Sequence, residues 1–393
     1  MRIGLVLPAI PAYSETFFRS KISGLIANGH EVVLFVNGKT PETQYCGARV
    51  VCSFSTQGNR MLLLLRAIVT LFVLLVSHAK TVFRFIKSER KEHASWSKLI
   101  SRLLLNATLL SERLDWLHFG FGTMALGREN VADAIGAKMA VSFRGFDITI
   151  YPLKHPGCYD KVWKKVDKIH VLSDDLADLI AKLGGEAIRG KCVKITPAID
   201  TAFFSRTLPL QTLQSPLQLL TIARLHWKKG LDYTLEALAL LHQKGVAFHY
   251  NIIGTGPEEE RLRFTAHQLG INPFVTFAGK QSPEYIKKQL EQTDVYVQYS
   301  IQEGFGNAVL EAQAMGVYCM VSDAEGLQEN VVHGVTGSVV TKRNPEALAN
   351  GITLFLDLDA TEKIKSSEQA IARVKQGYSV EKQQASFMKF YND

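Results

Sequence analysis

The sequence predicts an α/β protein of two doubly wound, Rossmann-like domains that face each other across a cleft. Its 393 residues exceed the ~250–300 at which a single hydrophobic core stops growing. The apolar fraction of 47% excludes a disordered chain. Short β-branched runs alternate with amphipathic stretches, which is typical of βαβ units and parallel sheets.

The alternation is clearest in the second half of the chain. Strands are expected at Gln218–Ala223, Phe248–Gly254, Phe274–Gly279, Asp294–Tyr299, Val317–Ser322 and Gly337–Thr341. Helical stretches lie between them, near 230–244, 258–270, 283–292, 307–316, 327–333 and 345–357. This order predicts a parallel sheet with helices on both faces.

The first half repeats the pattern less regularly. A helix is expected from Ser14 to Asn28, and strands at Ile3–Leu7, Glu31–Val36, Trp116–Phe119, Met139–Phe143 and Ile169–Leu172. Thr207–Pro216 has two prolines, few charges and no periodicity, so we place the linker there. The predicted domains are 1–206 and 207–376.

The net charge of +8 is unevenly distributed. Residues 1–205 hold 27 Lys and Arg against 17 Asp and Glu, whereas residues 206–393 hold 18 against 20. A basic half suits an anionic membrane or an acidic small molecule. No motif of a nucleic-acid-binding fold accompanies it, so nucleic acid is not an expected partner. Five cysteines without a CxxC pair and a start without a signal-peptide pattern predict a cytoplasmic protein.

Met61–Val76 is the most apolar stretch, and basic residues follow it as far as Lys91. Sixteen residues interrupted by Arg66 fall short of the ~20 needed to span a bilayer. The pattern favours an interfacial helix that binds an anionic membrane surface through residues 61–91. A buried core helix is the alternative.

Two predicted strand ends of the second half carry groups suited to phosphate. Arg224, Lys228 and Lys229 follow the first strand and precede a helix, whose N-terminus also favours anions. A glycine-containing loop, 303–307, follows the fourth strand and opens another helix. Ligands of open α/β sheets bind at the carboxyl ends of strands, so these segments predict a diphosphate site. A solvated helix start is the alternative for the three cations.

Two carboxylates accompany this predicted site. Glu303 lies in the loop, and Glu311 lies near the second turn of the helix that follows. A carboxylate on that helix could accept hydrogen bonds from a ribose diol, and the loop carboxylate could contact a sugar.

Four strings of the second half resemble the retaining glycosyltransferases of family 4, which have the GT-B fold. They are Ala223-Arg224-Leu225 with Lys228-Lys229-Gly230-Leu231, Ile253-Gly254-Thr255-Gly256-Pro257, Glu303-Gly304-Phe305-Gly306 with Glu311-Ala312, and Glu329-Asn330-Val331 with Gly334-Val335-Thr336-Gly337. The first half resembles the bacterial exopolysaccharide branch, of the colanic-acid type. Its strings are Ser14-Glu15-Thr16-Phe17, His118-Phe119-Gly120 and Phe143-Arg144-Gly145-Phe146-Asp147.

The resemblance implies a role for each matching residue. Arg224 and Lys229 would bind the donor diphosphate and act in catalysis with Glu303, which would contact the donor sugar, and with His118. Glu311 would hold the ribose. The other donor-side residues are Gly304, Phe305, Gly306, Asn307, Gly279, Lys280, Gly254, Gly326 and Leu327. Ser14, Glu15, Arg144 and Asp147 would lie on the acceptor side. No cofactor and no metal ion are expected, and residues 377–393 would pack back on the N-terminal domain.

Two positions depart from the family pattern. Arg144 stands where a histidine is common, and Glu325 stands in a usual Gly-Gly pair. The donor sugar, and UDP against GDP, therefore stay open. The expected function is retaining transfer of a sugar from a nucleoside diphosphate sugar to a lipid-linked or saccharide acceptor in bacterial cell-surface polysaccharide assembly. A soluble small acceptor and a catalytically silent nucleotide-sugar-binding protein are the alternatives.

Two other motifs are set aside. Gly254-Thr255-Gly256-Pro257 imitates a dinucleotide fingerprint, but its third glycine is missing and three glutamates follow. We interpret it as a tight turn. Asp357-Leu358-Asp359 ends an amphipathic stretch, so we do not expect it to hold a metal ion.

Overall fold

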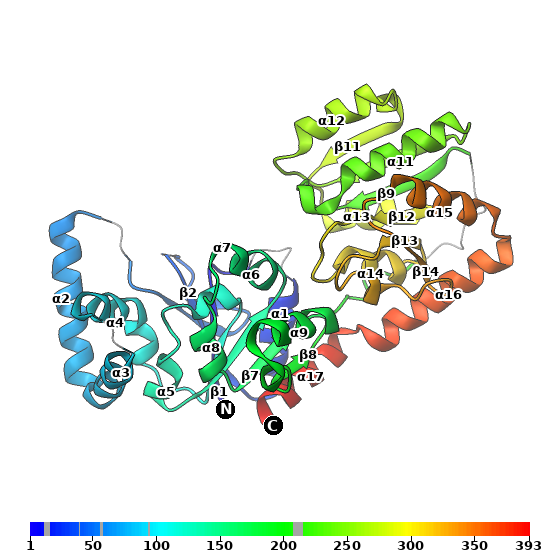
Figure 1. Ribbon diagram of the computed structural model, residues 1–393. Coiled ribbons are helices and arrows are strands. Elements are labelled where there is room, and N and C mark those ends of the chain that lie inside the picture. The colour runs from blue at the N-terminus through cyan, green and yellow to red at the C-terminus, as the bar shows by residue number, and fades with distance from the viewer. Residues whose placement is uncertain (12–15, 39, 56–57, 93–94, 207–214) are drawn as a thin grey trace. The chain divides into compact units, whose positions relative to one another are not determined.

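The computed structural model describes residues 1–393 except 12–15, 39, 56–57, 93–94 and 207–214 (Figure 1). Its contacts divide the chain into two compact units. The N-terminal unit is Met1–Ile195 with Gln383–Asp393, and the C-terminal unit is Thr196–Lys382. The predicted boundary lay at 206/207, and most of the predicted linker lies outside the described residues. The contacts change from one unit to the other after Ile195 and return after Lys382.

The N-terminal unit contains an eight-stranded sheet in the order β3-β4-β2-β1-β5-β6-β7-β8. The pairs are parallel except for β3 and β4. The strands are β1 (Arg2–Leu7), β2 (Glu31–Val36), β3 (Gln44–Tyr45), β4 (Ala48–Cys52), β5 (Trp116–Phe119), β6 (Lys138–Phe143), β7 (Lys168–Val171) and β8 (Cys192–Lys194). The helices before β5 are α1 (Thr16–Ala27), α2 (Arg60–Ser77), α3 (Ala79–Lys91) and α4 (Trp96–Leu110). The later ones are α5 (Val131–Ile135), α6 (Phe146–Thr149), α7 (Tyr151–Lys154), α8 (Asp160–Lys165), α9 (Asp174–Gly184) and α10 (Glu186–Arg189).

The helix α17 (Val380–Asn392) completes the core of this unit. Phe387 is buried against Phe17, with ring centroids 5.7 Å apart. The indole N–H of Trp116, in the central strand β5, donates to the carbonyl of Tyr391 at 3.0 Å. The sheet is therefore covered in part by residues far away in the sequence.

The C-terminal unit is a six-stranded parallel sheet in the order β11-β10-β9-β12-β13-β14. Its strands are β9 (Leu217–Ile222), β10 (Phe248–Ile253), β11 (Val275–Gly279), β12 (Val295–Gln298), β13 (Tyr318–Ser322) and β14 (Gly337–Val340). Its helices are α11 (Leu231–Gln243), α12 (Glu259–Gln268), α13 (Pro283–Glu291), α14 (Asn307–Ala314), α15 (Pro345–Asp357) and α16 (Ala360–Gly377).

Alternate side chains of the C-terminal strands enter two different cores. Leu219, Val297 and Met320 pack in a cluster with residues of α11, α12 and α15. Leu220, Tyr296 and Cys319 pack in a second cluster with residues of α13 and α14. A parallel sheet buried on both faces has this pattern. The prediction of two doubly wound α/β domains is thus confirmed.

The predicted apolar segment forms α2, and the structure excludes a core position for it. Only Leu74 of its 18 residues is buried. Within the part of the chain that the structure describes, α2 is the one helix long and apolar enough to cross a membrane by length and composition. Figure 1 shows it beside α3 and α4, on one side of the N-terminal sheet.

Candidate active site

The candidate site lies at the carboxyl ends of β9 and β12, which are neighbours in the C-terminal sheet. Residues 223–230 follow β9 and include a short 3-10 turn, Trp227–Lys229. Residues 299–306 follow β12 and lead into α14. The amide of Ile301 donates to the carbonyl of Lys228 at 2.7 Å, so the two segments are joined directly.

Gly230 lets these two segments approach. Its φ is +58°, a left-handed conformation, and a Cβ there would overlap the carbonyl oxygen of Tyr299. Only glycine satisfies both conditions without strain. The sequence motif after β9 therefore places Lys228 and Lys229 against the loop that follows β12.

An ion pair between Lys229 and Glu303 joins the two motifs. The Lys229 Nζ bonds to Glu303 Oε2, and the hydroxyl of Ser300 donates to the same oxygen at 3.2 Å. Both charged side chains are largely but not fully buried, with exposures of 20% and 15%. The structure thus brings together two residues that are 74 positions apart in the sequence.

Three cations and one carboxylate lie together where β9 and β12 end. Burial lowers the pKa of Lys228, and the nearby charges of Arg224 and Lys229 lower it further, although Glu303 acts in the opposite direction. Arg224 is exposed. Three cations beside one carboxylate favour a multiply charged anion, whose binding would relieve the repulsion among them.

Glu311 lies on α14, one helix turn after the first residue of that helix, Asn307. Burial raises the pKa of its carboxyl group to about 7. Burial is the main cause that raises the pKa of Tyr296, and the nearby charge of Glu311 raises it further. No side chain among the described residues pairs with the Glu311 carboxylate, which suits a group that meets a ligand.

The loop 304–307 is held from beneath rather than left open. The Gly306 amide donates to Asn330 Oδ1 at 3.1 Å, and Asn330 Nδ2 donates back to the Gly306 carbonyl at 3.3 Å. Phe305 is buried beside Tyr378. Gly304 and Asn307 keep exposed surface. The Gly306 N–H thus already has a partner within the protein, and the donor-side role of Gly306 stays a prediction.

Asn330 is the supporting residue that the sequence reasoning did not assign. It is fully buried, and its string Glu329-Asn330-Val331 was noted only as part of the resemblance. Leu327, expected on the donor side, is also fully buried, and it packs against Gly306. Leu327 therefore supports the loop from below, and Gly326 beside it has a φ of +70°.

Gly254 is required by packing rather than by ligand contact. Its φ is +140°, and a Cβ there would overlap the carbonyl oxygen of Ala223. Its amide donates to the carbonyl of Gly279 at 2.8 Å. Gly254 thus joins neighbouring strand ends, and its donor-side role stays a prediction. Lys280, next to Gly279, is exposed at the same edge.

His118 occupies a different position from the predicted one. It is 0% exposed within β5, and its ring nitrogens lie 2.6 Å from the Tyr391 hydroxyl and 2.8 Å from the Ser142 hydroxyl. The buried Lys21 amine lies 3.2 Å away. Burial holds the His118 pKa well below its usual value, so the ring is neutral. The expectation of a catalytic His118 is corrected, because a side chain enclosed in the core cannot touch a substrate.

Arg144 and Asp147 follow β6 at the carboxyl edge of the N-terminal sheet. The Arg144 guanidinium lies 4.0 Å from the centroid of Phe17 and donates to the Gly120 carbonyl at 3.2 Å. Asp147 is buried, and its carboxylate accepts backbone N–H groups of Gly122, Arg144 and Gly145 at 2.9 to 3.1 Å.

Burial raises the Asp147 pKa even with those bonds. The carboxylate shapes this turn of the backbone, so its predicted contact with acceptor is corrected. Arg144 keeps its place at the sheet edge. Ser14 and Glu15, the other predicted acceptor-side residues, lie outside the described residues.

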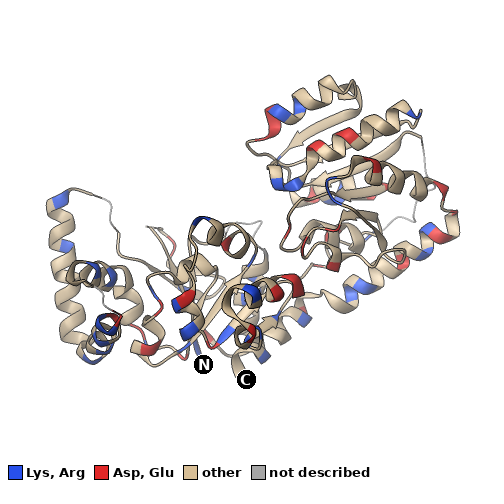
Figure 2. Cartoon of the chain, viewed as in Figure 1, with Lys and Arg blue, Asp and Glu red and all other residues tan. Residues whose placement is uncertain are grey.

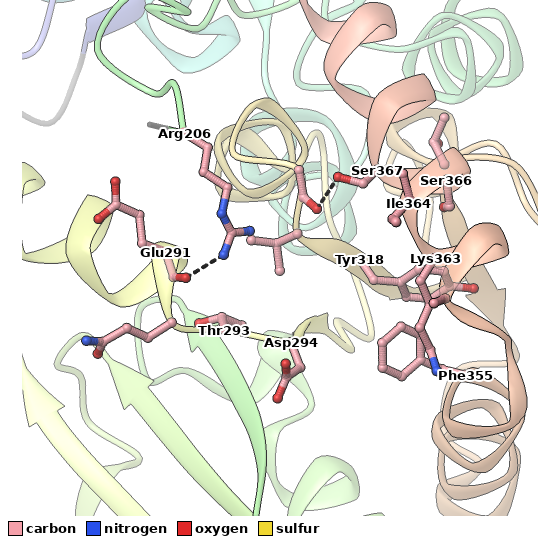
Figure 3. A pocket seen from close by; sticks show the side chains of 15 residues that line it. Arg206, Glu291, Thr293, Asp294, Tyr318, Phe355, Lys363, Ile364, Ser366 and Ser367 are labelled. Carbon is pink, nitrogen blue, oxygen red and sulfur yellow. Dashed lines mark hydrogen bonds between the residues drawn. The ribbon is translucent and has the colours of Figure 1, made fainter. Parts of the chain in front are cut away.

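A cavity of about 240 Å³ lies at the opposite edge of the C-terminal sheet (Figure 3). Asp294 and Val317, which line it, precede β12 and β13, so it is at the amino ends of the strands. Arg206 donates to the Glu291 carbonyl at 2.6 Å, and Ser367 donates to the Gly316 carbonyl at 2.7 Å. The first bond ties α13 to the segment that ends at Arg206, and the second ties α16 to the turn before β13. The cavity is separate from the candidate site.

Glu325 pairs with Lys342 at 2.9 Å, with both side chains partly exposed. The negative charge of Glu325, which stands in a usual Gly-Gly pair, is therefore neutralised by a lysine of the same unit.

Comparison with known proteins gives a consistent picture. The family described as Glycosyl transferases group 1 matches residues 210–376. The chain is 27% identical over 397 residues to an Escherichia coli protein named as a colanic acid biosynthesis glycosyltransferase, WcaL, covering 96% of each. It is 26% identical to the amylovoran biosynthesis glycosyltransferase AmsK of Erwinia amylovora, covering 63% of this chain and 64% of AmsK.

The fold is also that of solved structures. A structure of Anabaena HepE in complex with UDP superposes with a TM-score of 0.73 at 15% identity, covering 99% of this chain and 98% of HepE. A glycosyltransferase from Rickettsia africae gives 0.71 at 19% identity, covering 99% and 97%. At these identities the likeness is one of fold.

Proposed function

We propose that this chain transfers a sugar with retention from a nucleoside diphosphate sugar. The match of residues 210–376 to the glycosyl transferases group 1 family and the GT-B fold support this. The acceptor would be lipid-linked or a saccharide, in bacterial cell-surface polysaccharide assembly. The names of WcaL and AmsK support that setting. The enzyme would work in the cytoplasm, at the inner face of the membrane.

One observation carries the proposal: the Lys229–Glu303 pair lies beside Arg224 and Lys228 at the sheet edge where α/β proteins bind ligands. Arg224 and Lys229 would bind the diphosphate. Negative charge grows on the departing nucleotide as the glycosidic bond breaks, so fixed cations there stabilise the transition state more than the ground state.

Glu303 and Glu311 would divide the rest of the donor between them. A diphosphate at this edge would pair with Lys229, as Glu303 does. The Glu303 carboxylate could then accept hydrogen bonds from hydroxyl groups of the sugar. Glu311, without a partner among the described residues, would accept the ribose diol. Its pKa is about 7 in the absence of ligand. Hydrogen bonds donated by the ribose hydroxyls would favour the ionised carboxylate, so nucleotide binding would lower this pKa. Side-chain cations would neutralise the phosphates without a metal ion.

Donor-dependent nucleotide release tests the proposal. The full chain would be incubated with UDP- and GDP-sugars, alone, with membrane lipid extract or with a soluble saccharide, and with and without EDTA. We expect release from one donor, raised by lipid and indifferent to EDTA. Lys229→Ala and Glu303→Gln should each lower it by about 10²–10³. Lys365→Ala and Glu368→Gln, at exposed positions of α16, are the matched controls.

The outcomes separate the alternatives. Release that survives Lys229→Ala would contradict the assigned site. Nucleotide binding without release from any donor would favour a silent nucleotide-sugar-binding protein. Release that responds to a soluble saccharide and not to lipid would favour a soluble acceptor.

A further inference from the structure

The exposed side of α2 is apolar without interruption. Ten apolar side chains of α2 are at least 44% exposed: Met61, Leu62, Leu64, Leu65, Ile68, Val69, Phe72, Val73, Leu75 and Val76. The other exposed residues, Arg60 and Ser77, are at its two ends. At 3.6 residues per turn the apolar side chains occupy about half of the helix circumference. A helix of a soluble protein normally turns such a face inward. Here it faces away from the protein.

The other half of α2 faces the protein. Leu63, Ala67, Thr70 and Leu71 are half-buried and Leu74 is buried, where α2 packs against α4. The chain turns back at His78, which ends α2 and precedes α3. A helix that crossed a bilayer would need lipid or other helices around its whole circumference. One covered face and one apolar face are typical of a helix that lies in the membrane interface.

Positive charge surrounds this apolar face. Residues 60–110 hold nine Lys and Arg and only two Glu. Both glutamates are already engaged, Glu89 with Arg102 and Glu92 with Lys161. Figure 2 shows α2 tan along most of its length, with basic residues at its first turn and on α3. The exposed cations of α3 include Lys80, Arg84 and Lys87.

Exposed aromatic side chains lie on the adjoining helices. Phe83 of α3 is 67% exposed and Trp96 at the start of α4 is 63% exposed. The guanidinium of Arg90 lies 4.9 Å from the centroid of the Trp96 ring. Aromatic rings next to cations are typical of segments at the level of lipid headgroups.

We infer that α2, α3 and α4 form a docking surface for an anionic lipid bilayer, with α2 lying flat and half-embedded in the interface. The charge favours lipid over a second copy of the chain, because a symmetric pair across α2 would bring two strongly basic surfaces together. An anionic bilayer matches both features, the apolar face and the cations. We call α2, α3 and α4 together the docking surface.

The docking surface adjoins the carboxyl edge of the N-terminal sheet. A groove of about 460 Å³ is lined by Cys52 and Ser53, where β4 ends, and by Leu65, Arg66 and Val69 of α2. Lipid in contact with α2 would thus lie beside the edge where an acceptor is proposed to bind. The link between bound lipid and the acceptor rests on the proposed function, whereas the binding of lipid to α2 does not.

Vesicle flotation with the full chain tests the inference. Vesicles would contain either phosphatidylcholine alone or equal parts of phosphatidylcholine and phosphatidylglycerol. We expect binding to the anionic vesicles, weakened by salt and reversed by alkaline carbonate. Phe72→Glu should weaken binding tenfold or more, since it replaces a membrane-facing apolar group by a charge. Lys80→Gln and Lys87→Gln should each weaken it by roughly fivefold.

The controls repeat each change on a different helix. Leu354→Glu, at a side chain 67% exposed against 66% for Phe72, matches the apolar replacement on α15. Lys365→Gln on α16 matches the loss of a charge. Both should bind vesicles like the parent protein. Because Phe72 is exposed, its variant should keep the parental thermal midpoint, which excludes unfolding as the reason for lost binding.

Four results would overturn the inference. They are absence of vesicle binding by the parent protein, equal binding by Phe72→Glu, equal binding to neutral and anionic vesicles, and resistance to alkaline carbonate, which would indicate a membrane span. A dimer that Phe72→Glu dissociates, with no vesicle binding, would assign the face to a second copy instead. Vesicle binding needs no donor, so its failure and a failure of nucleotide release are read separately.

Discussion

Replacing Glu311 with Gln is expected to make the protein more stable at alkaline pH and to weaken its binding of nucleotide. The pKa of this carboxyl is about 7 in the folded chain and 4.5 in the unfolded chain. As pH rises between these values, the unfolded chain releases a proton that the folded chain retains. The free energy of unfolding therefore falls as pH rises through this window, and the loss is complete above the folded pKa.

The magnitude follows from the two pKa values. Their difference corresponds to at most about 3 kcal/mol at pH 8.5, and to less than about 1 kcal/mol at pH 5. Gln has nearly the same shape and no charge, so Glu311→Gln should regain most of this at pH 8.5 and little at pH 5. Denaturant unfolding of the parent and the variant at both pH values measures the difference. Glu368→Gln, exposed on α16, is the control.

Nucleotide binding should change in the opposite direction. A charge-assisted hydrogen bond is about twice as strong as a neutral one, so Glu311→Gln should bind UDP or GDP roughly tenfold more weakly above pH 7. Titration calorimetry at pH 8.5 measures this. A stability gain that is equal at both pH values, or no gain at all, would refute the assignment of a raised pKa to Glu311. A gain without weaker nucleotide binding would refute only the ribose contact.

Three further changes test the fold around the site. Gly254→Ala should lower the free energy of unfolding, measured by denaturant titration, by about 3 kcal/mol or more, because the positive φ and a neighbouring carbonyl exclude a Cβ. Gly270 also has a positive φ but has open space around it, so Gly270→Ala should lower this free energy by only about 1–2 kcal/mol. Phe387→Ala should cost about 3–5 kcal/mol by emptying the contact of α17 with the N-terminal core, whereas Phe264→Ala, 58% exposed, should change stability by about 0.5 kcal/mol or less. Asn330→Ala should lower nucleotide affinity, measured by calorimetry, because it releases the loop that it holds on both sides; unchanged affinity would show that the loop keeps its shape without it.

The C-terminal sheet was predictable because its strands are short apolar runs bounded by turn residues. Glu31–Val36 and Trp116–Phe119 of the N-terminal sheet were predicted with the bounds that the structure has. β4 and β8 were missed, since Ala48–Cys52 and Cys192–Lys194 have no long apolar run. Short strands at an edge of the sheet, such as β8, or next to an edge, such as β4, acquire their conformation from pairing, which a local pattern does not contain.

The charged residues of the candidate site could be predicted from the sequence, but the buried residues that hold its loops, such as Asn330, could not. Lys229 and Glu303 follow strands, and neighbouring parallel strands bring their ends together. Whether a residue at such an end faces ligand or core depends on what covers it. His118 follows the same rule of position, yet Tyr391, 273 residues later, encloses it. No pattern near His118 carries that information.

That enclosure has a consequence for the order in which the chain folds as it leaves the ribosome. Trp116 and Phe17 are covered by Tyr391 and Phe387, which are translated only after the whole C-terminal unit. Until then the nascent N-terminal domain holds an unfinished, apolar surface. The domain that is translated first therefore cannot complete its core before the second domain has also been translated. Chaperones that bind exposed apolar segments would meet this chain at its N-terminal half for most of its synthesis.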